Sequence, residues 1–310
     1  MAEFTETLTT ERAIACRQCG CTDVSKDGFF GDAQYFLCRK CETKFSGADG
    51  FPGMRYDRAT VARAMTYYYN GMSYRNVGIS LGSEDHREVP KWTAWRWVVK
   101  YSRVANAYTV GLPAEVGDVW MADETAIMVF GKQYWFWDLI DTKTRFLLAS
   151  HLSYSRDHAN ALKFFQMARW RTKTRPKVVL TDKLPAYYRA FNKVFYSPYP
   201  DKTAEHLTSS GFKSPTNINL LERFHGSLKA RVKVMKGLKR KDCARTVLDG
   251  FVTWYNFLTP HESLGMRTPA MATGNAKEPL TWRTLIELGL KAPKRNPEVS
   301  LEWPGRFGIQ

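Results

Sequence analysis

Three acidic residues in the second half of the chain have the types and spacing of a metal site. Asp123 and Asp182 each end a short apolar run, VWMAD and KVVLTD. A carboxylate at the end of a buried strand is costly to desolvate unless it is paired or holds a cation. Glu222 follows on a later helical segment, off its apolar stripe. Such oxygen ligands suit Mg²⁺ or Mn²⁺, and three of them can hold the two ions of phosphoryl-transfer chemistry.

Each of these acids has an alternative role or a rival. Glu124 competes with Asp123, and because side chains alternate across a strand only one of the two is expected to face the site. Asp182 is also a suitable cap for the helix that follows it. Glu205 is a rival for the third position held by Glu222.

The amino-terminal cysteines have the spacing of a structural zinc site. Cys16 and Cys19 form one CxxC pair, and Cys38 and Cys41 form a second after 18 intervening residues. Four thiolates at this spacing predict a zinc ribbon with one structural Zn²⁺ and no open coordination position. Cys21 could replace Cys19 as a ligand, and unbound thiols or disulfides are the alternative to a metal.

Half of the excess positive charge lies in one short segment. The chain has 46 basic and 30 acidic residues, a net charge of +16, and Arg223–Arg245 holds nine basic residues and one acid, Asp242. A solvated face normally interleaves both signs, so this bias indicates binding to a polyanion, most often nucleic acid. We expect phosphate contacts from Arg223, Lys229, Lys233, Lys236, Lys239, Arg240 and Lys241.

The region 55–105 predicts three helices. Asp57 can cap the first, and Ser73 can cap a second, short helix through Val77. Pro90 suits the first position of the third helix. This order resembles a helix-turn-helix DNA reader, although any three-helix packing unit has a similar pattern. In the DNA-reading interpretation the third helix contacts DNA through Lys91, Arg96 and Lys100.

From about residue 115 the pattern changes to strands. The run 119–123 predicts a short strand that ends at the first aspartate. Ile127–Phe130 and Tyr134–Ile140 predict a hairpin, and Phe146–Ser150 follows after a turn. Three sequential, antiparallel strands are therefore expected.

The next region alternates helices with one further strand. Asp157 can cap a helix, Lys177–Asp182 predicts a buried strand, and 184–193 predicts a second helix. The residues 193–214 show no clean period and predict a loop, and Thr216 begins a long helix. This order is that of an α/β, RNase H-like fold, with a mixed sheet flanked by helices.

Four motifs carry a resemblance to a known family. They are Trp120–Thr125 around the first aspartate, Thr181–Tyr187 around the second, Asn219–Lys229 around the glutamate, and the ending of Tyr255-Asn256, Pro260–Gly265 and Thr268–Ala270. Together they resemble the prokaryotic insertion-sequence transposases of the DDE class, which share the integrase-type catalytic core. The resemblance runs from about Cys16 to Gly274. One departure is the 39 residues between Asp182 and Glu222, slightly more than is usual in the family.

The resemblance implies a reaction, its cofactors and its partners. A DDE transposase hydrolyses a phosphodiester at the end of its element and joins the exposed 3′-hydroxyl to target DNA. Asp123, Asp182 and Glu222 would be its catalytic residues and would hold two Mg²⁺ or Mn²⁺ ions, and Lys229 would position a phosphate. The implied partners are double-stranded DNA, as element terminal repeats and as target, and further copies in a homodimer or higher oligomer.

Four parts of the chain are expected from these patterns. They are a zinc ribbon at 1–50, a helix-turn-helix domain at 51–110, the RNase H-like DDE catalytic core at 111–275 and a tail at 276–310. No window approaches the roughly 18 apolar residues of a membrane helix, so a cytoplasmic, nucleoid-associated protein is expected.

Two other functions fit parts of the pattern. A DNA-binding regulator derived from a transposase would lack catalysis, and its expected mark is the loss of at least one acid. A host nuclease could have the same core without needing domains that recognise defined DNA ends.

Overall fold

The computed structural model describes residues 14–16, 18–30, 33–46, 50–51, 54, 56–85, 88–199, 203–209, 219–234, 238 and 241–292. The chain divides into two compact units, Met1–Ala62 and Arg63–Gln310, which are described separately. No helix among the described residues is long and apolar enough to span a membrane.

The first unit contains a small antiparallel sheet. Its strands are β1 (Val24–Phe30), β2 (Ala33–Cys38) and β3 (Lys44–Ser46), in that order. Phe36 and Phe45 are buried and stack on each other, with their ring centroids 5.9 Å apart. They share a small core with Cys16 and Cys38, so the cysteine-bearing segments are part of the packing of this unit.

Three helices follow, at the positions predicted from the caps. They are α1 (Arg58–Tyr69), α2 (Tyr74–Asp85) and α3 (Lys91–Thr109). Asp57 Oδ1 accepts a hydrogen bond from the Thr60 N–H at 2.7 Å, and Ser73 Oγ accepts one from the Asn76 N–H at 3.2 Å. The second helix is longer than predicted, because Val77 and Leu81 lie one turn apart and are both buried.

The larger sheet has the strand order β6-β5-β4-β7-β8. Its strands are β4 (Val119–Val129), β5 (Lys132–Asp141), β6 (Leu147–Ser153), β7 (Val178–Thr181) and β8 (Glu205–Thr208). The first three form an antiparallel meander, whereas β7 and β8 run parallel to β4. This mixed, five-stranded arrangement confirms the RNase H-like fold predicted from the element order.

Two strands differ from the prediction. The expected break after Asp123 is absent, because pairing between β4 and β5 continues from Trp120↔Asp141 to Val129↔Lys132 and keeps the backbone extended. The segment predicted as a loop contains β8, which pairs with β7 from Val178↔Glu205 to Thr181↔Thr208. Four residues are too short for a periodic signal, and β8 forms only because β7 lies beside it.

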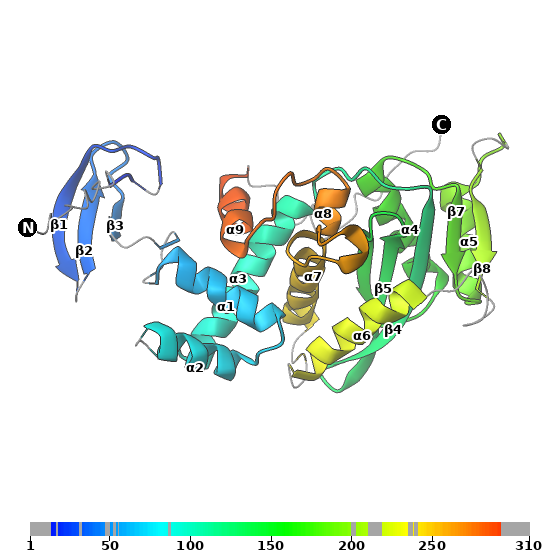
Figure 1. The fold of residues 1–310 in the computed structure, drawn as a ribbon, viewed down its shortest axis with the longest axis horizontal. Coiled ribbons are helices and arrows are strands. Elements are labelled where there is room, and N and C mark those ends of the chain that lie inside the picture. The colour runs from blue at the N-terminus through cyan, green and yellow to red at the C-terminus, as the bar shows by residue number, and fades with distance from the viewer. Residues whose placement is uncertain are drawn as a thin grey trace, which may run out of the picture. The chain divides into compact units, whose positions relative to one another are not determined.

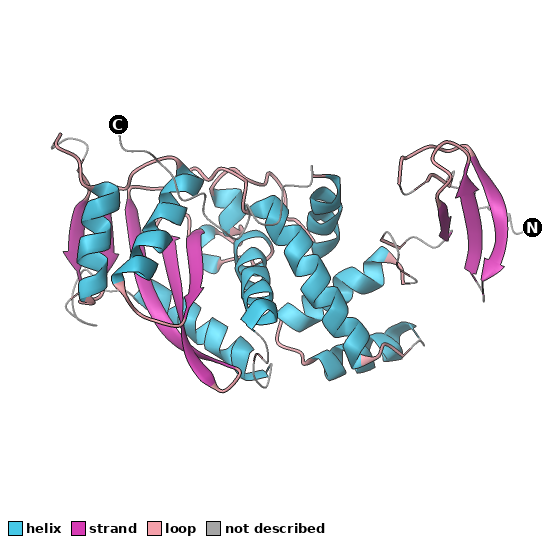
Figure 2. Ribbon diagram, turned by 180° about the vertical axis from the view of Figure 1, so that it is seen from behind, coloured by secondary structure: helices cyan, strands magenta, loops and turns pink. Residues whose placement is uncertain are grey.

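Helices cover both faces of the sheet (Figures 1 and 2). On one face α6 (Asn219–Val234) packs along β4, and on the other α4 (His158–Thr172) packs on β5 and β6 beside α5 (Pro185–Phe195). On this second face Trp137 of β5 packs edge-on against Tyr187 of α5, and both side chains are fully buried. Packed helices therefore cover both faces of the sheet around β4, the strand that carries Asp123.

The remaining helices join the sheet to the helical region. They are α7 (Lys241–Phe257), the short 3₁₀ turn η2 (Glu262–Leu264), α8 (Pro269–Ala272) and α9 (Trp282–Lys291). Both α7 and α9 pack against α3. Tyr69 stacks on Trp282, with ring centroids 5.0 Å apart. The segment expected as a tail, 276–310, thus contains a packed helix, and 293–310 lie outside the described residues.

Candidate metal and nucleic-acid sites

The parallel pairing of β4 with β7 brings the two aspartates together. The last paired residues are Met121 and Leu180, and each aspartate follows two positions later. Because parallel strands present their carboxyl ends at the same edge, Asp123 and Asp182 converge there. Asp123, Glu124 and Asp182 each offer a carboxylate oxygen, and these oxygens all lie within 4.8 Å of one another.

The prediction that only one of Asp123 and Glu124 can face the site is wrong. The two side chains do leave opposite faces of β4, with Asp123 toward His225 of α6 and Glu124 toward Tyr187 of α5. Beyond Met121, however, β7 no longer pairs with β4. Both carboxylates can therefore approach the same open edge of the strand, one from each face.

Both oxygens of Glu124 have protein partners. Tyr187 Oη donates a hydrogen bond to Oε2 at 2.6 Å, and Arg156 Nη1 lies 3.1 Å from Oε1. The Arg156 guanidinium also lies over the Trp135 ring, 4.6 Å from its centroid. Burial raises the pKa of Glu124 to about 7, and the hydrogen bond from Tyr187 opposes this rise. Each carboxylate oxygen of Glu124 thus already has a protein side chain as its partner.

Asp123 is differently placed. Its Oδ1 accepts a hydrogen bond from the Glu124 N–H at 2.9 Å, and its Oδ2 lies 3.7 Å from His225 Nδ1. Burial raises the pKa of Asp123 to about 7, while the neighbouring His225 opposes the rise and Asp138 adds to it. A carboxylate this costly to ionise gains most from a bound cation.

The third predicted acid lies on α6, the helix toward which Asp123 projects. Glu222 is half-buried in the first turn of α6, and this helix packs on β4. It lies three residues before His225, so both side chains are on one side of the helix. Among the described residues, Glu222 is not part of the 4.8 Å group.

Glu205 is poorly placed as a rival ligand. It is the first residue of β8 and pairs with Val178, four residues before Asp182. At about 3.3 Å per residue this offset is roughly 13 Å along the strand. Glu205 is therefore at the far end of the paired strands from the two aspartates.

The donor set fits divalent cations that prefer oxygen. Three carboxylates within reach of one another, two of them with a pKa raised by burial, form a site that a doubly charged ion would stabilise. The carboxylates that lie close enough to share such an ion are Asp123, Glu124 and Asp182, whereas Glu222 of α6 is outside this group.

Basic side chains are exposed on two helices. On α6 the exposed residues are Arg223, Lys229 and Lys233, three of those expected to contact phosphates. On α3 the exposed residues are Lys91, Arg96 and Lys100. The side chain of Lys241 and the residues Lys236, Lys239 and Arg240 lie outside the described part of the chain.

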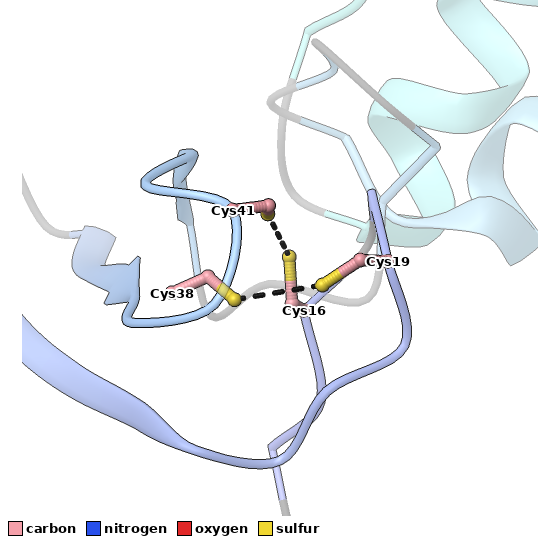
Figure 3. A group of neighbouring side chains, drawn as sticks. All are labelled: Cys16, Cys19, Cys38 and Cys41. Atoms are coloured by element: carbon pink, nitrogen blue, oxygen red, sulfur yellow. Dashed lines mark hydrogen bonds between the residues drawn. The ribbon is translucent and has the colours of Figure 1, made fainter.

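Four cysteines converge in the first unit (Figure 3). The Sγ atoms of Cys16 and Cys41 are 3.5 Å apart, those of Cys19 and Cys38 are 3.6 Å apart, and all four lie within 4.8 Å. The group contains Cys19 and not Cys21, and the structure has no disulfide among the described cysteines. Hydrogen bonding with Thr43 lowers the pKa of Cys41 to about 6, which favours a thiolate. This is the ligand set of a structural zinc site.

Sequence patterns alone missed four polar residues around the acids. Asp138 and His225 lie behind Asp123, and Arg156 and Tyr187 hold Glu124. His225 is buried on the apolar face of α6, a position that gives no sign of a polar role in the sequence. A signal for Asp138 was present, since it is the only charged residue within the apolar run Tyr134–Ile140.

The solved structures that are similar to this chain include an integrase core and an intasome. The integrase catalytic core domain of HTLV-2, in a magnesium-bound trimeric form, is 16% identical over 53% of this chain and 99% of its own, with a TM-score of 0.39. The intasome of simian T-cell lymphotropic virus, in complex with the PP2A regulatory subunit B56 gamma, is 13% identical over 71% of this chain and 77% of that one, with a TM-score of 0.41.

Sequence-family comparison gives the assignment. No curated protein sequence matches the chain. The family DDE_Tnp_IS240, described as a DDE domain, matches residues 117–260. This range contains β4, β7 and α6, and with them all three predicted acids. Residues 117–260 are therefore a DDE domain of the transposase type, built on an RNase H-like core.

Proposed function

We propose that the protein is an insertion-sequence transposase that cleaves the ends of its element and joins the 3′-hydroxyl to target DNA. The observation that carries this proposal is the convergence of Asp123 and Asp182 at one edge of β4 and β7, within a DDE domain. Glu222 completes the set from α6. A regulator without catalysis would have no need for three acids on these elements.

The residues of the chain have separate tasks in this reaction. Asp123, Asp182 and Glu222 bind the divalent cations, and the exposed Lys229, seven residues after Glu222, holds a phosphate beside them. Mg²⁺ or Mn²⁺ bound there would act as a Lewis acid and stabilise the negative charge that develops on the phosphoryl oxygens. Hydrolysis and joining are both in-line displacements at phosphorus, so one site serves both steps.

DNA recognition is assigned to the other parts of the chain. Helices α1–α3 are proposed to bind the terminal repeats through Lys91, Arg96 and Lys100, as a helix-turn-helix. The four cysteines are proposed to hold one structural Zn²⁺ in the ribbon. Two element ends must be held together, so the active form is proposed to be a homodimer or larger. A DNA substrate of this kind agrees with a cytoplasmic, nucleoid-associated location.

The test is a two-step assay with DNA taken from the flanks of the gene. A labelled duplex that carries the terminal inverted repeat is incubated with the protein and Mg²⁺, and release of a 3′-hydroxyl is followed by its joining to a plasmid. Activity on repeat ends but not on unrelated duplexes supports a transposase. Cleavage of all duplexes alike would favour a general nuclease, and binding without cleavage would favour a regulator.

A further inference from the structure

Asp123 has a second aspartate directly opposite it in the sheet. Asp138 of β5 pairs in register with Asp123 of β4, so the two side chains leave the same face toward α6. Asp138 is fully buried, and like charges placed opposite each other in a sheet destabilise it. An acid in this position needs a partner.

His225 of α6 is that partner. Its Nε2 lies 2.6 Å from Asp138 Oδ2, and its Nδ1 lies 3.7 Å from Asp123 Oδ2. Among the described residues, His225 is the sole hydrogen-bond partner of the Asp138 carboxylate, whose Oδ1 has none. The imidazole ring therefore lies between the two acids. It is also buried, so water does not screen its interactions with them.

The two contacts of the ring are unequal. The short bond to Asp138 fixes the orientation of the imidazole, because a hydrogen bond of 2.6 Å to a buried carboxylate is short and strong. At 3.7 Å, the approach to Asp123 is too long for a hydrogen bond. The ring is therefore held by Asp138 and faces Asp123. In known metal sites, residues that do not touch the metal orient its ligands through hydrogen bonds of this kind.

The same contact fixes the helix that carries Glu222. Residues three apart on a helix lie on neighbouring positions of one side. Anchoring His225 to β5 thus sets the position of Glu222 relative to β4, where Asp123 lies. A second contact between α6 and β5 is apolar, with the ring centroids of Phe224 and Phe136 6.5 Å apart. Apolar contacts of this kind have no fixed direction.

We propose that His225, held by Asp138, is a positioning residue that sets the placement of Glu222 and Asp123 and thereby the affinity of the site for divalent cations. This inference rests on the proposed function, since it assumes that these acids bind metal. Neither residue touches the DNA or the cation in this role.

The test measures Mn²⁺ binding to the purified full chain without DNA, from the electron paramagnetic resonance signal of free Mn²⁺. A double variant, His225→Leu with Asp138→Leu, removes the anchor and leaves no unpaired buried charge, so it is expected to fold. We expect its Mn²⁺ affinity to fall about tenfold or more, the usual effect of removing such an outer group. The single variant His225→Gln keeps a donor for Asp138 and should recover most of the affinity.

The matched control is a second buried histidine that joins a strand to a helix. His151 of β6 bonds to Asn160 of α4 at 2.9 Å, on a strand that is separated from β4 by β5. The double variant His151→Leu with Asn160→Leu should leave Mn²⁺ affinity unchanged. Thermal unfolding of each variant reports on folding separately.

Cleavage kinetics supply a second readout. In the His225→Leu, Asp138→Leu protein, the Mn²⁺ concentration for half-maximal cleavage should rise more than the rate at saturating Mn²⁺ falls. Wild-type Mn²⁺ affinity in this folded double variant would overturn the inference, and so would failure of a folded His225→Gln protein to recover affinity. Wild-type affinity in Asp123→Asn would instead show that the proposed metal site itself is wrong.

Discussion

At the scale of single residues, two adjacent acids of β4 have different surroundings. Glu124 is held through both oxygens, by Tyr187 and by Arg156. Asp123 has one oxygen bonded to a backbone N–H and the other facing His225 beyond hydrogen-bond distance. Asp123 therefore has more capacity left for a cation, although both carboxylates reach the same edge.

This difference predicts the outcome of single substitutions. Asp123→Asn, Asp182→Asn and Glu222→Gln should each abolish cleavage and joining while DNA binding remains, because each removes a charge that the cations require. Loss of several kcal/mol of transition-state stabilisation corresponds to a rate lower by about a thousandfold or more. The measurement is single-turnover release of the 3′-hydroxyl from a labelled repeat duplex.

The controls for this prediction lie nearby. Glu205→Gln should retain full activity, because Glu205 is at the other end of β8 from the site. Glu124→Gln should lose less than about tenfold, since an amide keeps the bond to Tyr187 and removes only the charge pair with Arg156, whose own side chain is 39% exposed. Full activity in Asp123→Asn together with loss in Glu124→Gln would move the first ligand to Glu124.

The raised pKa of Asp123 predicts how pH and metal act on stability. Its pKa is about 7 in the folded chain and close to 4 when unfolded, so between these values the folded state binds more protons. Protonation of Asp123 therefore adds to the free energy of unfolding of the metal-free protein at low pH, and this added stability is lost as the pH rises through about 7. A cation binds the ionised form, so Mg²⁺ should raise the melting temperature more at pH 8 than at pH 6. An equal shift at both pH values would contradict the placement of Asp123 in the cation site.

At the scale of elements, α6 links three parts of the machinery. Its first turn carries Glu222, its buried face carries His225, and Lys229 and Lys233 are exposed along it. Near its end Arg231 is buried over the Tyr68 ring, 3.8 Å from the centroid. The helix therefore connects the acids of the sheet to α1 as one rigid element.

The exposed bases of α6 predict a salt dependence of DNA binding. Removing one lysine that binds a phosphate should reduce the log–log slope of affinity against salt by about 0.9. Lys229→Ala with Lys233→Ala should lower the slope for specific and unrelated duplexes alike. The exposed pair Lys91→Ala with Arg96→Ala tests α3 in the same way. An unchanged slope in the α6 variant would mean that this face is turned to solvent and not to DNA.

At the scale of the whole molecule, the chain is built from two units with separate means of stabilisation. The first has a small core in which two of the four clustered cysteines are themselves buried. The second has an extensive aromatic core around the sheet, including Trp120, Trp137 and Phe165. A unit as small as the first usually needs a metal or disulfides to fold.

Zinc removal should therefore affect one unit and spare the other. Cys38→Ser should abolish binding of one Zn²⁺ per chain and unfold the ribbon, because a site of this kind folds only with its ion. Elemental analysis and thermal unfolding are the measurements, and the main transition of the second unit should persist. Cys21→Ser is the matched control and should keep its zinc. Zinc-free wild-type protein that retains a folded ribbon would contradict this prediction.

The acids, the cysteine pairs and the RNase H-like element order could all be predicted from the sequence. Apolar periodicity and caps such as Asp57 and Asp157 are local signals, and the structure has helices at both positions. The two CxxC pairs likewise specify a cluster by spacing alone. Such features depend on residues close together in the chain.

Only the tertiary structure decided which side chains meet. β8 exists because β7 offers it a parallel partner, and Glu124 joins Asp123 because β7 stops pairing with β4 at Met121. Asp138 and His225 are 87 residues apart and meet because α6 packs on the face from which Asp138 projects. These contacts depend on strand order and helix packing across long separations, and the local pattern of a sequence does not encode either one.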